Sequence, residues 1–561
     1  MLAKVTFSPT YRRIELDHGK REKRILLKAW AGCLMAFCCL AGCGGETEVE
    51  KATSEGILIM GNSSEPKGID PHIVSGVLEN NVIRSLFEGL VIEHHSKNGE
   101  YLPGVAKKVE HDGNSTVWTF HLREEARWSD GEPLTSEDFM FSFQRILTPS
   151  LGSDYSFMLY YIEGAEDFHK GETTDFTTVG VTAPNDHTLR VKLRGPLPFL
   201  PEITKHYTWF PVPKHVVLDH GKMGEPFTDW TKPGNLVCNG PFKLKSWRIN
   251  DHIEVERNPE YWDAENVGIN GIRFLPINNS YTETRMFFSG QLHLTYRVPP
   301  EMIAYSAEHY PENLRTEPWI ATYFIRCNVD RDAFKDKRVR KAFSMTIDQQ
   351  SIIDNVTLGK QLPATGIVPA FGDYPASKQV SFNPEAARKL LAEAGYPNGE
   401  GLPDIEFLTT DQDSAKALAE ALQAMWLEHL GVTIKIRQLE WTTYLDTMFK
   451  QEYDLAAGGW VGDYLDPLTF LDMWIEGGGN NRTGWSNEKF EALLDEVQKT
   501  GDKGLRYKKL KEAEELFLEE RPVLPIYWYT RNYLISRDVQ GWNPLILDNH
   551  PYKFLKLESA D

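Results

Sequence analysis

The chain has 561 residues, of which 41% are hydrophobic and 25% charged, and its formal net charge is −19. This length is too great for a single hydrophobic core, so we expect two or three globular domains. The acidic balance argues against nucleic-acid binding and against adhesion of the folded surface to anionic lipid, because both need basic patches. The 15 tryptophans suit either a large core or a ligand cleft lined by rings.

The N-terminus is predicted to be a targeting segment. A basic region over 20–28 precedes twelve uncharged residues, 29–40, which suit the apolar part of a signal peptide and are too short to cross a bilayer. The run ends in Leu-Ala-Gly before Cys43 and resembles the lipobox of bacterial lipoproteins, in which the thiol carries a lipid. We expect a signal peptide over 1–42, a lipid anchor on Cys43 and a flexible polar tether over 43–55. The alternative is a buried helix with a chance cysteine.

Two cysteines remain beyond the leader and the lipidated residue, Cys238 and Cys327. That number does not indicate a disulfide scaffold. The two thiols could pair in an oxidising compartment, but we expect both to be buried and unpaired. The mature protein is expected to be a body held by its lipid outside the cytoplasm, in the periplasm or at the cell surface.

The central and C-terminal parts of the chain alternate between strand and helix patterns, which favours α/β lobes with mixed sheets. Hydrophobic alternation predicts a strand at Val117–Leu122. Start and stop signals predict helices at 135–147 (opened by a capping box of Thr135 and Asp138), at 384–394 (capped by Asn383), at 414–430, at 486–499 and at 505–519, with a strand at 432–436.

A glycine-rich loop at 458–467 places Asp463 between two large aromatic residues, Trp460 and Tyr464. Glycines let a backbone approach a ligand closely, and aromatic rings form flat walls. Such a loop suits a small cationic group, such as the terminal amine of a peptide. The alternative is a surface turn in which Asp466 caps a helix that starts with proline; that alternative leaves Asp463 unexplained.

Six stretches of the sequence, taken together and in this order, resemble the bacterial solute-binding proteins of the oligopeptide-binding class. They lie at 118–123 with 126–135, at 239–242 with 256–262, and at 336–343, 386–396, 440–446 and 458–467, and the resemblance extends over nearly all of 56–561. It implies a two-lobed periplasmic-binding-protein fold with mixed sheets, a hinge between the lobes and an extra subdomain on lobe I. The implied divisions are lobe I at 56–88, 212–320 and 531–561, the subdomain at 89–211 and lobe II at 321–530.

The resemblance also implies a ligand and a site. An extended oligopeptide would lie between the lobes of a monomer, which would deliver it to the membrane subunits of an ABC importer or to a sensor. The implied contacts are Asp463 for the α-amino group, a ligand-facing strand that starts near 70–72 and continues through Ser75, Gly76 and Val77 for backbone pairing, and walls from Tyr155, Trp441, Trp460 and Tyr464. For Tyr155 and Trp441 a place in the core is an equal alternative.

The sequence departs from this family where its well-studied members bind the peptide carboxylate. Those positions fall on Thr357, Ala415 and Ala457, none of which is basic. Arg482 is a nearby candidate, with a solvated loop charge as its alternative reading. We therefore expect a cleft that leaves the far end of the peptide free. Two cysteines that often pair in the family are also replaced, by Ala321 and Val461.

Other functions are weighed against this one. We expect no cofactor and no metal, and the sequence lacks the usual nucleophile, zinc and phosphate-loop motifs of enzymes. A peptide hydrolase is the alternative from another class, since paired carboxylates such as Asp463 and Asp466 could act as acid and base. Within the same fold, the alternative ligands are haem, a nickel chelate, a murein peptide or an oligosaccharide.

Overall fold

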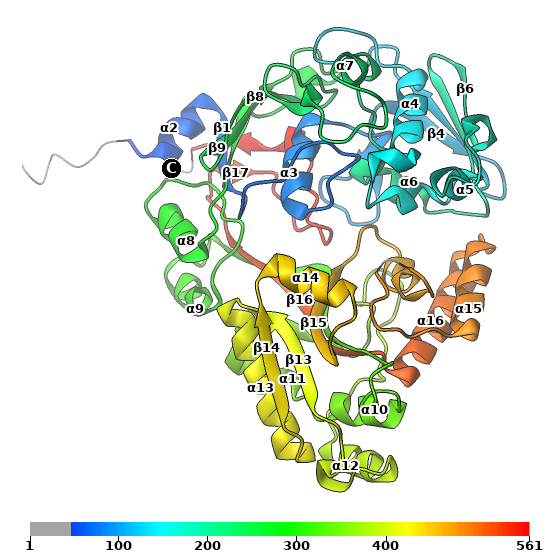
Figure 1. Ribbon diagram of the computed structural model, residues 1–561. Coiled ribbons are helices and arrows are strands. Elements are labelled where there is room, and N and C mark those ends of the chain that lie inside the picture. The colour runs from blue at the N-terminus through cyan, green and yellow to red at the C-terminus, as the bar shows by residue number, and fades with distance from the viewer. Residues whose placement is uncertain (1–45, 479, 560–561) are drawn as a thin grey trace, which may run out of the picture.

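The computed structural model describes residues 46–478 and 480–559, which form two lobes (Figure 1). The predicted signal peptide and Cys43 lie outside the described residues. In the part of the chain that is described, every helix is too short or too polar to span a bilayer.

The predicted flexible tether needs a correction over its second half. Glu48–Glu55 forms helix α2, opened by a capping box between Thr47 and Glu50. Val49 and Ala52, three residues apart and therefore on one face of the helix, are buried. The composition of this segment is polar, but two small apolar residues at helical spacing are enough to hold it against lobe I.

Lobe I, the upper lobe in Figure 1, contains a four-stranded sheet in the order β1-β10-β9-β8. Strand β1 is parallel to β10, and the other pairs are antiparallel. Its elements are β1 (Ile57–Gly61), α3 (Val77–Leu86), α7 (Lys214–Asp219), β8 (Phe242–Arg248), β9 (His252–Arg257), β10 (Gly271–Leu275), α8 (Ser280–Phe288), α9 (Pro300–His309), β17 (Val539–Gln540) and β18 (Lys556–Leu557).

The subdomain packs on lobe I and carries a second four-stranded sheet in the order β4-β5-β7-β6. One hydrophobic cluster includes Leu58 of lobe I and Phe120 of the subdomain, so the two share a core. The elements of the subdomain are β2 (Val91–Glu93), β3 (Tyr101–Pro103), β4 (Ala106–His111), β5 (Val117–Leu122), α4 (Ser136–Leu147), α5 (Ala165–His169), β6 (Val181–Asn185), β7 (Thr188–Lys192) and α6 (Leu200–Thr204).

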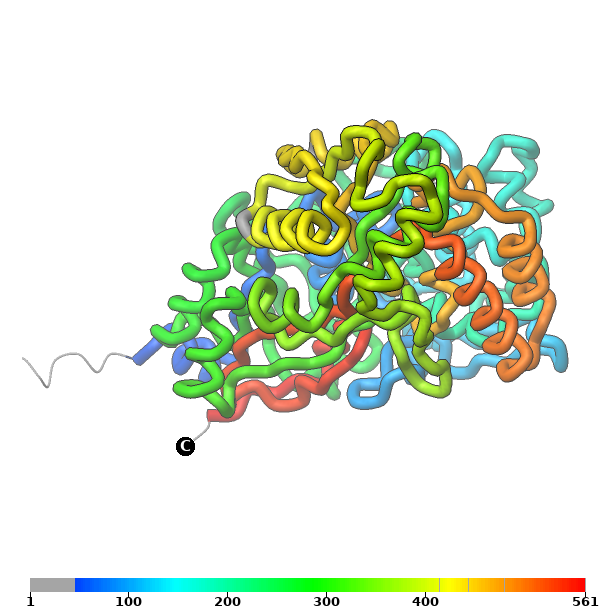
Figure 2. Tube along the Cα trace, turned by 90° about the horizontal axis from the view of Figure 1, so that it is seen from below, coloured from blue at the N-terminus to red at the C-terminus, as the bar shows by residue number. Residues whose placement is uncertain are grey.

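Lobe II is built on a six-stranded mixed sheet in the order β12-β16-β11-β15-β13-β14. Its strands are β11 (Leu314–Cys327), β12 (Leu362–Pro363), β13 (Ile405–Thr410), β14 (Ile434–Leu439), β15 (Leu455–Val461) and β16 (Val523–Leu534), and its helices are α10 (Lys337–Met345), α11 (Gln349–Ile352), α12 (Pro384–Glu393), α13 (Asp413–Leu430), α14 (Trp441–Phe449), α15 (Glu488–Gln498) and α16 (Lys503–Glu520). Helices α15 and α16 lie on the same side of the molecule as the subdomain (Figures 1 and 2).

Two long strands connect the lobes. The start of β11 pairs with the end of β16. The end of β16 is bonded to lobe I, because the backbone N–H of Thr295 donates to the carbonyl of Leu534. The register of this pair shifts between Pro318 and Thr322, beside the predicted boundary between lobe I and lobe II after residue 320. A proline removes a ladder hydrogen bond, so the ribbon is weakest between the lobes. The predicted lobe boundaries themselves stay a prediction.

Several local predictions are confirmed. The capping box of Thr135 and Asp138 opens α4, and Asn383 caps α12 with proline at its first position. Asp466 caps a short 3-10 turn that starts at Pro467. Cys238 and Cys327 are buried and unpaired, and burial raises the pKa of each thiol to about 12, so both are inert packing groups.

Candidate functional site

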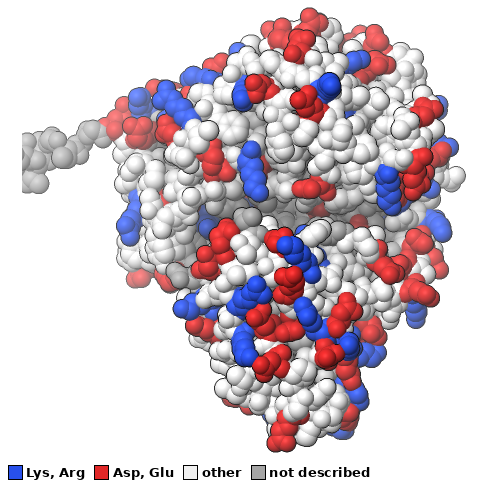
Figure 3. Space-filling view, viewed as in Figure 1, with Lys and Arg blue, Asp and Glu red and all other residues white. Residues whose placement is uncertain are grey.

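A groove separates the two lobes on the face shown in Figure 3, and acidic and basic side chains are mixed along its rims. The predicted ligand loop follows β15 at the lobe II side of this groove. Gly462 donates its N–H to the carbonyl of Ile320, at 2.8 Å. Asp463 donates its N–H to the hydroxyl of Thr469, at 3.1 Å. The loop is therefore fixed in place before any ligand binds.

Asp463 is a carboxylate that the fold does not neutralise. Among the described residues, no cation lies within 4 Å of it. Burial, and then the nearby Asp472, raise the pKa of Asp463 to about 8. A cation that binds beside such a carboxyl group stabilises its ionised form, because the attraction between the charges offsets the cost of ionising the group away from water.

Asp463 faces the subdomain across the groove. Its charge is the largest cause of the raised pKa of Tyr155, and it adds to the effect of burial in raising the pKa of Tyr207. The hydroxyl of Tyr207 donates to the carbonyl of Val74, at 3.2 Å. The tertiary structure thus brings Asp463, Tyr155 and the segment before Ser75 to one place, although nearly 400 residues separate the ends of this set in the sequence.

Asp466, three residues further on, has a structural role. It forms a two-pronged pair with Arg506, with N–O distances of 3.0 and 3.1 Å, and both side chains are buried. It also accepts from the backbone N–H of Leu468. The guanidinium of Arg506 lies 4.3 Å from the ring centre of Phe199 in the subdomain. The predicted capping role of Asp466 is therefore combined with a contact between the lobes.

Tyr464, a predicted ligand wall, lies in the contact between the lobes instead of facing open space in the groove. Only 2% of it is exposed, and its ring stacks on Phe199. Its hydroxyl lies 3.1 Å from the hydroxyl of Tyr161 and donates to Asp472, also at 3.1 Å. Tyr464 is thus covered by the subdomain and holds the two lobes together.

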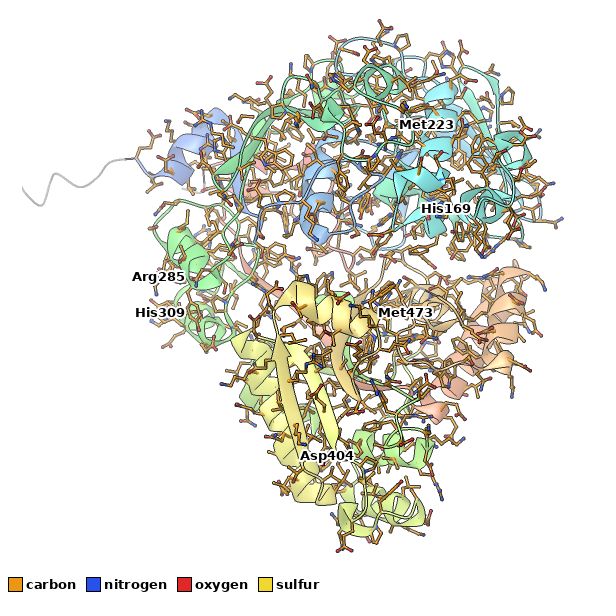
Figure 4. All side chains as sticks on the ribbon, viewed as in Figure 1. His169, Met223, Arg285, His309, Asp404 and Met473 are labelled. Atoms are coloured by element: carbon orange, nitrogen blue, oxygen red, sulfur yellow. The ribbon has the colours of Figure 1, made fainter. Side chains whose placement is uncertain are left out.

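Asp472 is a second acid beside the groove and, like Asp463, it is half-buried. Burial raises its pKa to about 7, while the hydroxyl of Tyr464 lowers it. Figure 4 shows Met473, the residue after Asp472, in the part of lobe II that lies below the subdomain. His169 marks the subdomain above it in the same view. Two poorly compensated acids therefore lie close together at this contact between the lobes, a feature that cationic ligands would stabilise.

The other predicted walls are placed in different ways. Trp460 is half-buried, and among the described residues its indole N–H finds no acceptor. Tyr155 is half-buried and stacks on His206, with ring centres 5.6 Å apart. Trp441 starts α14 and is 53% exposed, and it stacks on Tyr444. Trp460 and Trp441 therefore keep surface that a ligand can contact.

The prediction of a strand that starts near 70–72 and continues through 75–77 is wrong, whereas the ligand contacts of Ser75, Gly76 and Val77 stay a prediction. Asp70 is buried and pairs with Arg145, at 2.6 Å, which turns this segment into the core. Val77 is the first residue of α3, and Gly76 before it is extended at φ −105° and ψ 155°. Ser75 is exposed. A short extended piece at Ser75 and Gly76 remains, but a buried ion pair and a helix start prevent a strand on either side.

None of Thr357, Ala415 and Ala457 offers a cation. The hydroxyl of Thr357 donates to Gln361, Ala415 lies in α13, and the carbonyl of Ala457 accepts from the hydroxyl of Tyr444. Arg482 lies over the ring of Phe449, at 5.9 Å, beside a pocket of about 330 Å³.

Sequence reasoning missed Tyr207, Tyr161 and Asp472. Tyr207 falls in a proline-rich stretch that reads as a connection, and Tyr161 has no motif around it. Asp472 lies nine residues after Asp463, and only this short spacing could have drawn attention to it. Their roles depend on contacts across the groove, which no local pattern reveals.

The protein has two lobes that are joined by a pair of strands, and a half-buried acid faces the groove between them. These features define a binding protein that closes on a solute. The sequence matches the family of bacterial extracellular solute-binding proteins, family 5 middle, over residues 100–482. The match covers more than half of the chain, and the chain belongs to this family. It is a binding protein, because the family consists of solute-binding proteins and not of enzymes.

Individual relatives extend the similarity to nearly the whole chain. The chain is 36% identical over 498 residues to the periplasmic oligopeptide-binding protein OppA of Salmonella typhimurium, covering 86% of this chain and 89% of that one. It is 33% identical over 488 residues to the periplasmic murein peptide-binding protein MppA of Escherichia coli, covering 85% and 88%. A crystal structure of Haemophilus influenzae OppA in complex with RPPGFSPFR has a TM-score of 0.78 and 30% identity, covering 90% and 99%.

Proposed function

We propose that this protein captures oligopeptides in the groove between its lobes and delivers them to an ABC importer. The observation that carries the proposal is Asp463, a half-buried carboxylate that faces the groove and has no cation within 4 Å among the described residues. A protonated peptide amine supplies that cation. Two relatives whose names state oligopeptide and murein peptide binding support peptides as the class of ligand.

The strength of the amine contact follows from its setting. Two unit charges about 4 Å apart attract by about 4 kcal/mol at an effective dielectric near 20, before desolvation costs. Each 1.4 kcal/mol corresponds to about a tenfold change in affinity. We expect Asp463→Asn to weaken the binding of a peptide with a free amine by at least about tenfold, and to change the binding of its N-acetylated form little.

Titration calorimetry with this pair of peptides tests the proposal. The matched control is Asp446→Asn, which removes an exposed acid on α14 that pairs with Lys450 and should leave both affinities unchanged. Equal losses for the free and the acetylated peptide in Asp463→Asn would contradict the amine contact. Failure of the wild type to bind any peptide would contradict the proposed function itself.

A murein peptide is the second candidate ligand, supported by the relative that binds it. Mass spectrometry of ligands that remain bound through native purification distinguishes the two: a mixture of ordinary peptides supports the first, and D-amino-acid peptides support the second.

We further propose that the protein acts outside the cytoplasm on a lipid anchor at Cys43. The support is the lipobox-like sequence before this residue and the extracellular location in the name of the family. Partition of wild type and Cys43→Ala between detergent and aqueous phases tests the anchor, and equal partition would contradict it.

A further inference from the structure

Arg326 is a buried cation in lobe II that the contacts described so far do not explain. It lies near the end of β11 and is 5% exposed. Its hydrogen-bond contact is with the thioether sulfur of Met448, at 3.6 Å from Nη1, and its Nε has no partner. Within the described ranges, no carboxylate lies within 4 Å of it.

The other buried arginines differ from Arg326 in having oxygen acceptors. Arg145 and Arg506 each form a close pair with an aspartate. Arg340 donates to several backbone carbonyls, the shortest at 2.6 Å, and Arg521 donates to the carbonyl of Gln379. Each of these four has an oxygen acceptor, as a buried charge requires. Among the described residues, Arg326 alone of the five has none.

A glycine on the neighbouring strand leaves the space that the Arg326 side chain fills. Gly458 of β15 lies beside it on the neighbouring strand, and a Cβ at that position would collide with Nη1 of Arg326. The guanidinium also lies 4.9 Å from the ring centre of Phe324 and 5.9 Å from that of Trp474. Aromatic faces attract a cation without using its N–H groups, so the donors of Arg326 stay available.

A second guanidinium is near. Burial lowers the pKa of Arg326 most, and the positive charge of Arg482 lowers it further. The loop that carries Arg482 is tied to this place, because the hydroxyl of Tyr453 donates to the carbonyl of Arg482. Arg482 and Phe449, the residue after Met448, line the pocket of about 330 Å³. Glu476 also lines this pocket, and Arg326 lies outside its lining, against Met448. Arg326, with two rings beside it and no oxygen acceptor among the described residues, suits a planar anion that accepts from a guanidinium.

We propose that Arg326 binds a carboxylate of the captured ligand, either the C-terminal carboxylate of a peptide or an acidic side chain. The inference rests on the proposed function, since it takes the ligand to be a peptide. Gly458, beside Arg326, and Asp463 are five residues apart on one strand and its loop, which is at most about 17 Å in an extended chain. An extended peptide of about five residues covers that length, so one strand would bring an amine site and a carboxylate site to the two ends of the ligand.

This site reverses an expectation from the sequence. The loss of basic residues at Thr357, Ala415 and Ala457 predicts a peptide whose far end is free, and amidation of the peptide would then change nothing. Arg326 lies on β11, whereas Thr357 and Ala415 lie in helical segments and Ala457 lies on β15, so no comparison restricted to those three positions could find it. The two expectations give opposite results in the same experiment.

The experiment uses the full protein and four probes in titration calorimetry: pentaalanine, its C-terminal amide, and two pentaalanine amides with a central glutamate or glutamine. We expect wild type to bind a carboxylate-bearing probe at least about tenfold more tightly than its neutral partner. A difference within the first pair identifies the C-terminus, and a difference within the second identifies an acidic side chain. Arg326→Met should abolish the difference, and Arg326→Lys should keep part of it.

The outcomes separate this inference from the proposed function. If wild type binds all four probes with equal affinity, or if Arg326→Met keeps the discrimination, the inference is wrong while peptide binding stands. If wild type binds none of the four probes and no longer peptide either, the proposed function itself is wrong. The wild-type comparison needs no variant, so it decides the matter even if Arg326→Met folds poorly. Asp463→Asn is the matched control, because it should lower all four affinities and leave the carboxylate discrimination unchanged.

Discussion

Asp463 and Asp466 lie three residues apart in one loop, yet the fold treats them in opposite ways. Asp466 is neutralised by Arg506, which lies 40 residues away in the chain. Asp463 has no such partner among the described residues and a pKa near 8. A neutralised buried carboxylate stabilises the fold, whereas an uncompensated one at a groove is prepared for a ligand. The comparison supports the proposed role of Asp463 without reference to any relative.

The strongest test of the comparison is the loss of the structural acid. Asp466→Asn leaves Arg506 buried without a counter-charge, which costs about 3–5 kcal/mol of unfolding free energy in such sites. Asp463→Asn should cost far less. Urea denaturation of both variants without ligand measures the difference. Equal losses would show that the two acids do not have separate roles.

A smaller effect is expected in the dependence of stability on pH. The folded-state pKa values of Asp463 and Asp472 are raised, to about 8 and about 7, so the folded protein binds more protons than the unfolded chain between about pH 4 and 8. The free energy of unfolding contributed by these groups therefore falls as pH rises through that range, by less than about 1.4 kcal/mol per pH unit for each group.

Asp463→Asn should remove its share of this slope. Denaturation at pH 5 and pH 8 measures it, with Asp446→Asn as the control because that acid is exposed. A wild type and an Asp463→Asn variant with the same slope would show that Asp463 ionises normally in the folded protein.

The smallest effect is expected at the contact between the lobes. Tyr161→Phe removes the hydroxyl that contacts Tyr464 and Asp472, and one hydrogen bond contributes about 1 kcal/mol. If this contact forms only in the closed state, affinity for a peptide should fall by about fivefold. Tyr101→Phe, at an exposed tyrosine in β3, is the control. An unchanged affinity would show that the contact does not depend on closure.

Local sequence signals determined much of the fold. Helix caps such as Thr135 with Asp138 and Asn383 with Pro384 act within three residues, and the glycines of the 458–467 segment predict a loop there. The same signals gave Asp463 as a candidate, and the six ordered stretches gave the family. These features could be predicted because the groups that interact are neighbours in the chain.

Tertiary structure alone decided which residues serve the site. The sequence could not show that Arg506 neutralises Asp466, that Phe199 and Tyr161 cover Tyr464, or that Arg145 turns Asp70 into the core. It gave no sign that Arg326 is buried without an oxygen acceptor. The cost of a buried charge depends on which distant groups the fold brings within about 4 Å of it, and that information is absent from any short stretch of sequence.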